Sequence, residues 1–328
     1  MAFFSSKVPQ NYDKTQRLDK YIAATNPDMN RSKLKSGVVS IFVNGRAQKI
    51  SYKVKAGDQI DIQWEENVPD NIEPENIPLN IIYEDDNVCV VDKEQGMVTH
   101  PACGNWNGTL VNALLFHWGR QAIKELKEGE ASADKILANR RPGIVHRLDQ
   151  PVEGLVVFGR TKEAAADLSR QLTEHRMGKE YLAVVEKELP VGEKQTFTDY
   201  LKKERQQAMV STAKDPAAKR AVLDCQVVAS SAGKSLLQIR LETGRFHQIR
   251  CQLSHRGMPI AGDVRYGGSR QLQPKNIALC AWRLTFAHPK TGKKMCFVQR
   301  PSQEAFSCFA QEIDGLCKTM LTDPIKGV

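Results

Sequence analysis

Short apolar segments rich in β-branched residues recur along the chain, and brief polar turns separate most of them. Segments of this length and composition form strands whose side chains are largely buried. We expect strands at residues 88–91, 155–158, 179–185, 221–228, 235–241 and 277–286. Helical spacing of apolar residues is limited to a few stretches, among them 109–118, 161–176 and 303–318. Because few helices separate the strands, the pattern predicts an α+β fold with a mixed, mostly antiparallel sheet and flanking helices, not a doubly wound sheet.

The composition is that of an ordinary globular protein, with 41% hydrophobic and 26% charged residues in 328. That length exceeds one typical domain. No apolar run approaches the roughly 18 residues of a membrane span, and the N-terminal residues lack the apolar core of a secretory signal. The eight cysteines are scattered without a Cys-x-x-Cys pair, and the histidines show no metal-ligand spacing. We therefore expect a monomeric cytoplasmic protein with reduced cysteines and no metal site.

Basic residues are concentrated at the start of the chain. The net charge is +9 with a pI of about 9.1, and residues 1–63 hold eleven Lys/Arg against five Asp/Glu, which gives +6 of that excess. An asymmetric basic charge predicts a polyanionic partner. Residues 64–78 are acidic and Pro-rich without periodicity, so we expect a linker there. The highly charged residues 119–140 predict a surface excursion with a helical piece at 122–127.

The basic segment itself predicts a small α/β unit. A short amphipathic helix is expected from Arg17, and a second from the N-cap residue Asn30 to near Gly37. The β-rich run 38–43 leads into Asn44-Gly45, a strong hairpin signal. A second strand pair is expected at 52–54 and 59–62, separated by a turn at Gly57-Asp58.

This arrangement over residues 15–63 resembles the RNA-binding module named after ribosomal protein S-four. The resemblance rests on the Arg-Leu-Asp-Lys opening, the Arg-Ser-x-Leu helix and the Val-Asn-Gly turn. It implies that RNA contacts are made by Arg17, Arg31, Lys33 and Lys35. The alternative is a solvated charged helix on a small structural domain.

An aspartate occupies a distinctive position in residues 146–154, which read His-Arg-Leu-Asp-Gln-Pro-Val-Glu-Gly. Pro151 and Gly154 mark a bend, so Asp149 is expected on a turn at the edge of the buried strand that follows. His146 and Arg147 should lie close by as cationic groups that favour its charged form. An ionised carboxylate can serve as nucleophile or base. The alternative is a turn-capping aspartate paired with a structural arginine.

Two further segments carry candidate functional side chains. Tyr181 lies in a Lys-x-Tyr-x-Ala-x-Val setting, although an aromatic residue on a strand is more often part of a core. Residues 244–250 read Gly-Arg-Phe-His-Gln-Ile-Arg and continue through Gly262-Asp263 to Tyr266-Gly267. The alternative for this second segment is a surface strand bearing Arg and His.

Taken together, the three segments resemble, in the same order, the motifs of the RluA-type RNA pseudouridine synthases. In that family the motifs read His-Arg-Leu-Asp-x-x-Thr-Ser-Gly and Gly-Arg-Thr-His-Gln-Ile-Arg, so this chain departs at Val152, Glu153 and Phe246. The resemblance implies that Asp149 is catalytic and that Tyr181 stacks on the target base. It also implies that Arg250 pairs with Asp149, and that Arg147 fills the space left by the extruded base or holds the displaced strand.

The activity implied by this resemblance is the isomerisation of uridine to pseudouridine in RNA, which needs no cofactor. Large-subunit ribosomal RNA is the first expected substrate, and transfer RNA the second. Two alternatives come from other classes of protein. A non-catalytic RNA-binding assembly factor would have no chemical reason to keep Asp149, Tyr181 and Arg250. A hydrolase using His146 and Asp149 would need a nucleophilic Ser or Cys in a recognisable elbow, and the chain has none.

Overall fold

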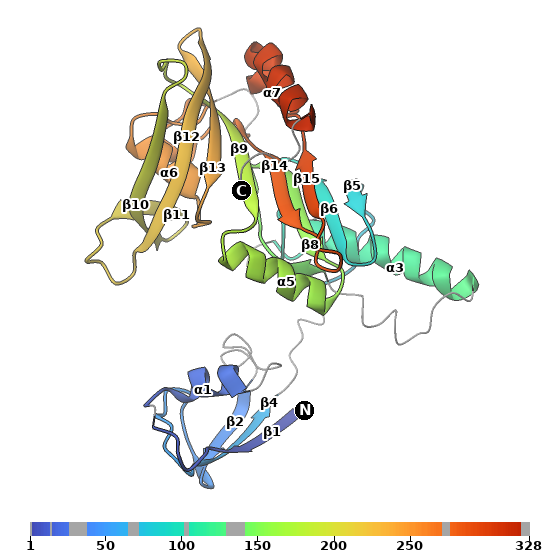
Figure 1. Ribbon diagram of the computed structural model, residues 1–328, viewed down its shortest axis with the longest axis vertical. Helices are drawn as coiled ribbons and strands as arrows, with labels where there is room; N and C mark the ends of the chain where they lie inside the picture. The colour runs from blue at the N-terminus through green and yellow to red at the C-terminus, as the bar shows by residue number, and fades with distance from the viewer. Residues whose placement is uncertain are drawn as a thin grey trace. The chain divides into compact units, whose positions relative to one another are not determined.

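The computed structural model describes residues 2–13, 15–25, 38–64, 72–101, 105–128, 142–270 and 276–322. The chain divides into two compact units, Met1–Asn71 and Ile72–Val328 (Figure 1). Each unit has hydrophobic core residues of its own. None of the helices in the described ranges combines the length and the apolar character that a bilayer crossing requires.

The first unit is a four-stranded sheet with one described helix, α1 (Leu18–Thr25). The strands are in the order β1-β4-β2-β3, with β1 (Ala2–Lys7), β2 (Val38–Val43), β3 (Arg46–Ala47) and β4 (Gln59–Trp64). Asn44 and Gly45 have φ values of 54° and 75°, the left-handed conformation of a tight hairpin. The helix beginning near Arg17 and the hairpin are therefore confirmed.

The strand pair expected in this unit is not observed. Residues 52–54 do not pair with 59–62. Lys53 forms an isolated bridge with Arg17. Val54 instead donates to the Gln16 carbonyl and is buried in the core, while β4 pairs with β1 and β2. The second expected helix lies outside the described residues, as do Arg31, Lys33 and Lys35.

The second unit is built on an eleven-stranded sheet in the order β11-β10-β12-β13-β9-β14-β8-β6-β5, with β15 paired to β14 and β7 to β8. Among the described ladders the pairing of β14 with β8 is parallel and the others are antiparallel. The strands are β5 (Asn80–Glu84), β6 (Val88–Lys93), β7 (Gly143–Ile144), β8 (Glu153–Gly159), β9 (Gly178–Val185), β10 (Lys194–Glu204), β11 (Gln207–Ser211), β12 (Lys219–Ser231), β13 (Lys234–Leu241), β14 (Leu279–Ala287) and β15 (Lys294–Val298). The predicted mixed, mostly antiparallel α+β fold is confirmed.

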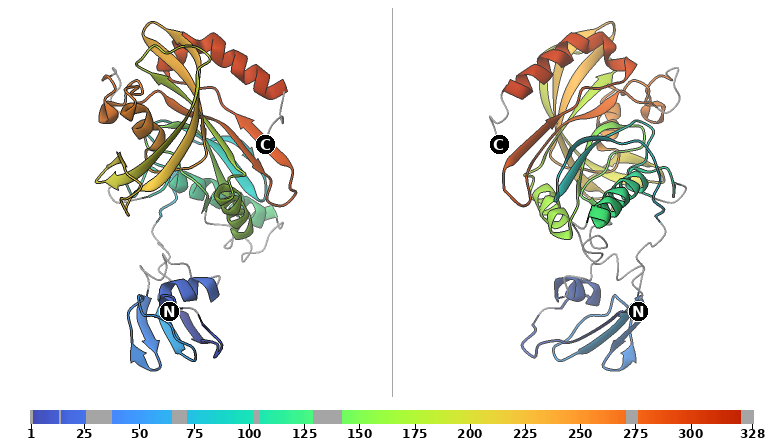
Figure 2. Two further views of the ribbon diagram at one scale, coloured as in Figure 1. Left: turned by 60° about the vertical axis from the view of Figure 1, so that its left-hand side comes forward. Right: turned by 90° about the vertical axis from the view of Figure 1, so that its right-hand side faces the viewer.

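Strand β8 is buried on both faces, which explains its uninterrupted apolar sequence. Val156 and Phe158 join one hydrophobic cluster, while Leu155 and Val157 join another on the opposite face. The twisted sheet can be followed in two further views (Figure 2). Because β8 lies between β14 and β6, the loop that precedes it is anchored to an interior strand of the sheet.

Helices flank the sheet. Helix α5 (Lys162–Thr173), capped by Thr161, contacts β8 and β14, and α6 (Gln248–His255) contacts β10 and β11. Helix α3 (Leu110–Glu128) is continuous, so the helical piece expected at 122–127 is confirmed, but as the end of the helix predicted at 109–118 and not as part of a separate excursion. Residues 129–140 of the expected excursion lie outside the described residues. The last elements that the structure describes are a short 3-10 helix, η2 (Glu304–Phe309), and α7 (Ala310–Thr322).

Part of the segment predicted as a linker contacts the start of α3. Asn112 donates to the Glu73 carbonyl at 2.7 Å, and the backbone N–H of Gly108 donates to the Glu75 carboxylate at 3.0 Å. Residues 73–75 therefore belong to the second unit and are not part of a free linker.

Candidate active site

Asp149 lies on the loop that joins β7 to β8, and the loop is tied to a neighbouring turn. Leu148 accepts a hydrogen bond from Thr99 Oγ1 at 3.0 Å, and the Gln150 carbonyl accepts one from the Gly96 backbone at 2.9 Å. At the end of the loop Gly154 has a φ of +115°, and a Cβ placed there would lie 2.3 Å from the Ala281 carbonyl oxygen. Glycine alone adopts this backbone conformation readily and leaves room for the Ala281 carbonyl. These two requirements explain why the motif has glycine at position 154.

Lys93 also holds this loop through hydrogen bonds. Its side chain is fully buried, and its Nζ donates to the carbonyls of Glu94, Met97 and Gln150 at 2.9, 2.8 and 3.4 Å. Burial lowers the pKa of Lys93 to about 8, although the nearby Asp149 charge acts in the opposite direction. Lys93 was not predicted, because a lysine at the end of an apolar strand usually reaches solvent.

The carboxylate of Asp149 faces two side chains from the segment 244–250. Its Oδ2 lies 3.5 Å from Arg250 Nη1 and 3.6 Å from His247 Nε2, and the side chain is 27% exposed. Burial raises the pKa of Asp149, and the charges of Arg250 and Arg147 offset part of that rise. The cations thus act in the expected direction, but the cost of burying the carboxylate outweighs them.

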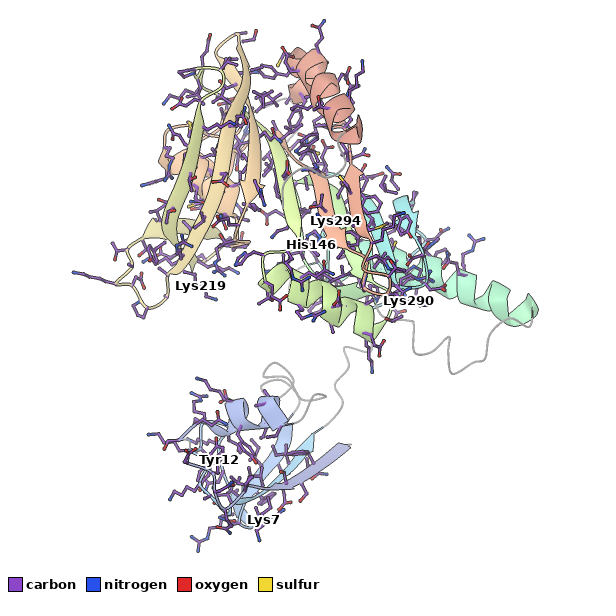
Figure 3. The ribbon with its side chains drawn as sticks, viewed as in Figure 1. Lys7, Tyr12, His146, Lys219, Lys290 and Lys294 are labelled. Atoms are coloured by element: carbon purple, nitrogen blue, oxygen red, sulfur yellow. The ribbon has the colours of Figure 1, made fainter. Side chains whose placement is uncertain are left out.

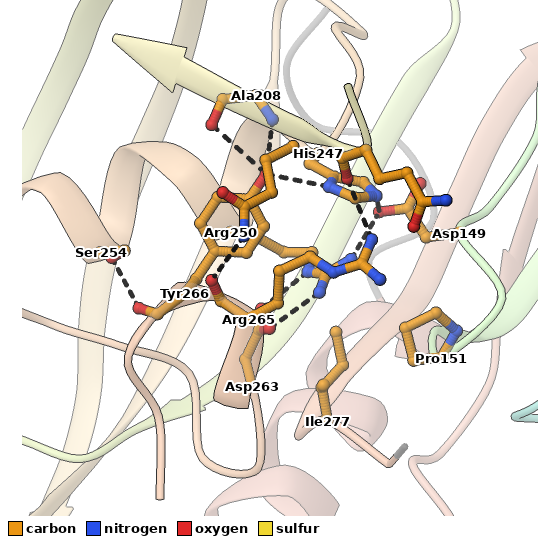
Figure 4. A network of polar contacts seen from close by, with 12 residues as sticks. Asp149, Pro151, Ala208, His247, Arg250, Ser254, Asp263, Arg265, Tyr266 and Ile277 are labelled. Carbon is orange, nitrogen blue, oxygen red and sulfur yellow. Dashed lines mark hydrogen bonds and ion pairs between the residues drawn. The ribbon is translucent and has the colours of Figure 1, made fainter. Parts of the chain in front are cut away.

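Arg250 is held more closely by Asp263 than by Asp149. Its Nε and Nη2 donate to the two Asp263 oxygens at 2.6 and 2.7 Å, and both side chains are buried (Figure 4). The guanidinium also lies 5.0 Å from the centre of the Tyr266 ring. These bidentate hydrogen bonds fix the plane of the guanidinium and leave Nη1 directed at Asp149. Asp263 and Tyr266 lie in the continuation of the segment 244–250, but no role was predicted for either of them.

His247 is the second side chain that reaches Asp149, and its role was also missed. It adopts a left-handed conformation with φ 50° at the start of α6, and its Nδ1 lies 2.9 Å from the Tyr266 hydroxyl. That hydroxyl accepts a hydrogen bond from Ala208 N at 2.7 Å, and its proton has two possible acceptors, the Ala208 carbonyl oxygen at 3.4 Å and Nδ1 at 2.9 Å. We assign the proton to the shorter contact, with Nδ1. His247 then carries its own proton on Nε2, which faces Asp149. Burial, reinforced by nearby cations, lowers the pKa of His247 to about 3, so the ring is neutral.

A cavity of about 580 Å³ opens over these groups, a size that suits a small ligand. Tyr181 on β9 forms part of its wall, with a side chain that is 7% exposed and a pKa raised by burial. Arg147, which is exposed, also lines it. All four predicted catalytic-domain residues therefore meet in one cavity: Asp149, Arg147, Tyr181 and Arg250.

His146 does not act as expected from the sequence. Its Nε2 accepts a hydrogen bond from the backbone N–H of Val157 at 3.2 Å, which requires an unprotonated nitrogen. Burial and then the charge of Lys179 lower the pKa of His146 to about 3. The predicted cation beside Asp149 is instead a neutral ring that braces β8, because its position within the fold is shielded from water. Figure 3 labels its side chain.

The three departures from the motif have structural roles. Val152 is buried, and the Glu153 carboxylate accepts hydrogen bonds from Ser302 N and Oγ at 3.0 and 2.6 Å. Phe246 stacks on His247, with a centroid separation of 3.8 Å. Its ring also lies 4.7 Å from Lys203 Nζ. These residues brace the loops around the cavity.

The remaining predicted site residue that the structure describes, Arg17, belongs to the first unit. Its Nε lies 3.1 Å from Asp19 Oδ1. Nothing in the described residues groups three or more His, Cys, Asp or Glu side chains as a metal site.

Comparisons with known proteins agree with this geometry. A family model described as RNA pseudouridylate synthase matches residues 87–255. An uncharacterized RNA pseudouridine synthase of Chlorobaculum parvum is 36% identical over 302 residues, covering 86% of this chain and 89% of its own. The ribosomal large subunit pseudouridine synthase D of Pasteurella multocida is 36% identical over 297 residues, covering 85% and 86%. Among solved structures, human RNA Pseudouridylate Synthase Domain Containing 1 has a TM-score of 0.51 at 19% identity, covering 75% of this chain and 96% of that one, which supports the fold.

Proposed function

This chain belongs to the RNA pseudouridylate synthase family, and we propose that it isomerises a uridine in large-subunit ribosomal RNA. It is an isomerase. The observation that supports the proposed substrate is the similarity along most of the chain to enzymes named for the ribosomal large subunit. We expect the protein to act as a monomer in the cytoplasm.

In this reaction the bond between uracil N1 and the sugar carbon C1′ breaks, the base turns, and C5 bonds to the same sugar carbon. C5 loses a proton and N1 gains one, so substrate and product have the same atoms. We assign Asp149 as the catalytic group. It could attack the sugar, add to the base or remove a sugar proton, and each of these roles requires its ionised form. Arg250 and His247 Nε2 are placed to favour that form, against the effect of burial.

The target base must leave its stack to reach Asp149, at a cost of a few kcal/mol. Tyr181 supports the extruded uracil, because its ring lines the cavity that Asp149 faces. Arg147 is exposed at the same cavity and carries a planar group that can both stack and bind phosphate. We assign it to the space the base leaves behind or to the displaced strand.

Residues 1–63 would act as an S-four-like RNA-binding module, followed by the linker 64–78 and the catalytic domain 79–328. The charge of +6 on the first segment supports this assignment, and so does the described hairpin at Asn44-Gly45. The contacts expected there come from Arg17, Arg31, Lys33 and Lys35. Phosphate contacts of this kind would position RNA without reading its sequence.

The test is to incubate the protein with unmodified transcripts of large-subunit ribosomal RNA and, separately, of transfer RNA, and then to map pseudouridines. We expect modification of the ribosomal transcript by the wild type and none by Asp149→Asn. Modification of transfer RNA alone would overturn the proposed substrate. Equal product from both proteins would overturn the assignment of Asp149.

A further inference from the structure

Lys179 is a buried cation that the chemistry described above does not use. It lies on β9 (Figure 1) with a side chain that is 8% exposed, and it lines the same cavity as Asp149 and Tyr181. Burial lowers the pKa of Lys179 to about 8, so its ammonium group is still charged at neutral pH. Because a buried charge is costly unless it is paired and hydrogen-bonded, the position of this group requires an explanation.

The Lys179 ammonium group has no hydrogen-bond acceptor and no ion pair among the residues that the structure describes. Its neighbour Glu180 points to the opposite face of the sheet, where the carboxylate accepts hydrogen bonds from Arg283 and Gln238. Lys93, which is also buried, donates to three carbonyl oxygens instead. Lys93 therefore serves the fold, whereas the donors of Lys179 are left for a molecule that enters the cavity.

A glycine in a distant segment keeps space for this ammonium group. A Cβ placed on Gly244 would lie 3.2 Å from Lys179 Nζ, which is closer than such atoms normally approach. Gly244 does not have the positive φ that would explain a glycine by its turn conformation. We therefore attribute this glycine to the space that Lys179 needs, so that the segments 179–181 and 244–250 together set where the ammonium group lies.

Lys179 lies at the end of the cavity away from Asp149. The Asp149 charge raises the pKa values of Lys93 and Tyr181, but the pKa of Lys179 reflects burial alone. Lys179 and Tyr181 are two residues apart on one face of β9, with Cα atoms separated by roughly 6.6 Å. A uracil ring that rests on Tyr181 with its glycosidic bond at Asp149 therefore directs its far edge, which carries O4, toward Lys179.

Negative charge develops on the uracil in each of the three roles open to Asp149. When the bond between N1 and C1′ breaks, its electron pair stays on the base and is shared with the carbonyl oxygens. When Asp149 adds to the base at C6, the charge is shared by C5 and O4. Uracil also has an approximate twofold axis through N3 and C6, so the turn that exchanges N1 with C5 also exchanges O4 with O2. A donor at this edge therefore faces a carbonyl oxygen before and after the turn.

We propose that Lys179 donates a hydrogen bond to the uracil carbonyl oxygen at this edge and stabilises the negative charge that the base acquires during isomerisation. A charged donor that is fixed in a site shielded from water contributes far more than the same donor in solution. The ammonium group keeps its proton and forms no covalent bond. Cytosine has an amino donor where uracil has O4, so the same contact favours uracil. This inference rests on the proposed function and assigns the base end of its site.

The first measurement is thermal unfolding of the full-length protein without RNA. Lys179→Met keeps the length of the side chain and removes an unpaired buried charge, so it should raise the melting temperature. The matched control is Lys93→Met, the same change at a buried lysine that holds three carbonyl oxygens, and it should lower the melting temperature. A lower melting temperature for Lys179→Met would show that this ammonium group holds the fold, and would overturn the proposal.

The second measurement is a single-turnover assay on unmodified transcripts of large-subunit ribosomal RNA and of transfer RNA, using whichever the wild type modifies. Lys179→Met should slow the reaction at saturating RNA by about 100-fold, with the affinity for RNA and its salt dependence unchanged. A wild-type rate would overturn the proposal. So would a loss of about 0.7 to 0.9 from the slope of log affinity against log salt, because that loss indicates a phosphate contact. An inactive wild type would instead refute the proposed function.

The third measurement tests the contact with the carbonyl oxygen directly. The modified uridine is first mapped and is then replaced in the transcript by 4-thiouridine, whose sulfur is a weak acceptor. The replacement should slow the wild type, but it should have little further effect on Lys179→Met, because the donor is already absent. If sulfur changed the rates of both proteins by the same factor, Lys179 would not bind this edge of the base.

Discussion

Asp263 binds two nitrogens of Arg250 and thereby leaves Nη1 to face Asp149. The carboxylate that we propose as catalytic is thus oriented by an arginine that is itself held by a second, more deeply buried carboxylate. This arrangement separates two tasks: Asp263 neutralises most of the buried cation, and Asp149 keeps enough exposure to meet a substrate.

Replacing Asp149 with Asn should abolish isomerisation and make the folded protein more stable. Burial raises the pKa of Asp149, so at neutral pH the fold contains a carboxylate that would be better solvated in the unfolded chain. Affinity for RNA should change by less than tenfold, or about 1.4 kcal/mol. Thermal unfolding at pH 7 and a single-turnover assay measure the two effects. The control is Asp263→Asn, which makes the same chemical change and should lower stability. If Asp149→Asn melted below the wild type, burial would not be the dominant influence on Asp149.

Arg250→Met should cost about 3–5 kcal/mol of folding stability, because Asp263 would be left buried without its partner. The double variant Arg250→Met with Asp263→Asn should recover part of that loss while remaining inactive, since Asp149 would still lack its cation. Urea unfolding of the wild type, the two single variants and the double variant gives the coupling energy directly. Additive single effects would show that the two side chains do not stabilise each other.

Two histidines that are neutral in the folded protein should contribute a loss of stability as the pH falls. The pKa values of His146 and His247 are lowered from 6.5 to about 3, so the unfolded chain binds protons first as the pH drops below 6.5. Each ring should therefore add up to ~1.4 kcal/mol per pH unit to the loss of stability between these limits. Replacing His146 with Gln, which can still accept from Val157 N–H, should make the dependence shallower by up to one proton. The measurement is the unfolding free energy of both proteins at a series of pH values between 4 and 7, about 0.5 unit apart. If the variant had the same slope as the wild type, the assignment of His146 as neutral would be wrong.

Removing residues 1–63 should weaken RNA binding and its salt dependence while leaving much of the single-turnover rate at saturating RNA. The deleted segment carries +6 of the +9 net charge, whereas Asp149, Tyr181 and Arg250 all lie in the other unit. The slope should not vanish, because residues 64–328 keep the other +3 of the net charge. Salt-dependent affinities and rates for both proteins provide the measurement. Equal slopes would remove the case for an RNA-binding module in the first unit.

The sequence predicted elements well where local pattern and burial agree. The apolar run at β8 and the helical spacing of α5 gave nearly correct bounds. The β10–β11 hairpin and β15 were not predicted, because their strands carry exposed polar residues and few continuous apolar positions. Their existence depends on pairing with strands distant in sequence, which a local pattern does not reveal.

The same limit applies to the site. Motif resemblance brought Asp149, Arg147, Tyr181 and Arg250 to one cavity, since each is recognisable by its neighbours in sequence. The support of Arg250 by Asp263 is a long-range relationship between side chains, and so is the burial that neutralises His146. The net effect on the Asp149 pKa likewise depends on the depth of the cavity, which no motif specifies.

The three carbonyl contacts of Lys93 have a consequence for local fluctuations. The loop bearing Asp149 and the turn at 94–97 both accept hydrogen bonds from the Lys93 ammonium group. If either segment opened, the buried ammonium group would lose hydrogen-bond acceptors. Hydrogen exchange should therefore report the two segments as one cooperative unit that opens only at substantial free energy. In the protein without RNA, the position of the Asp149 carboxylate is therefore already set by the resistance of this unit to opening.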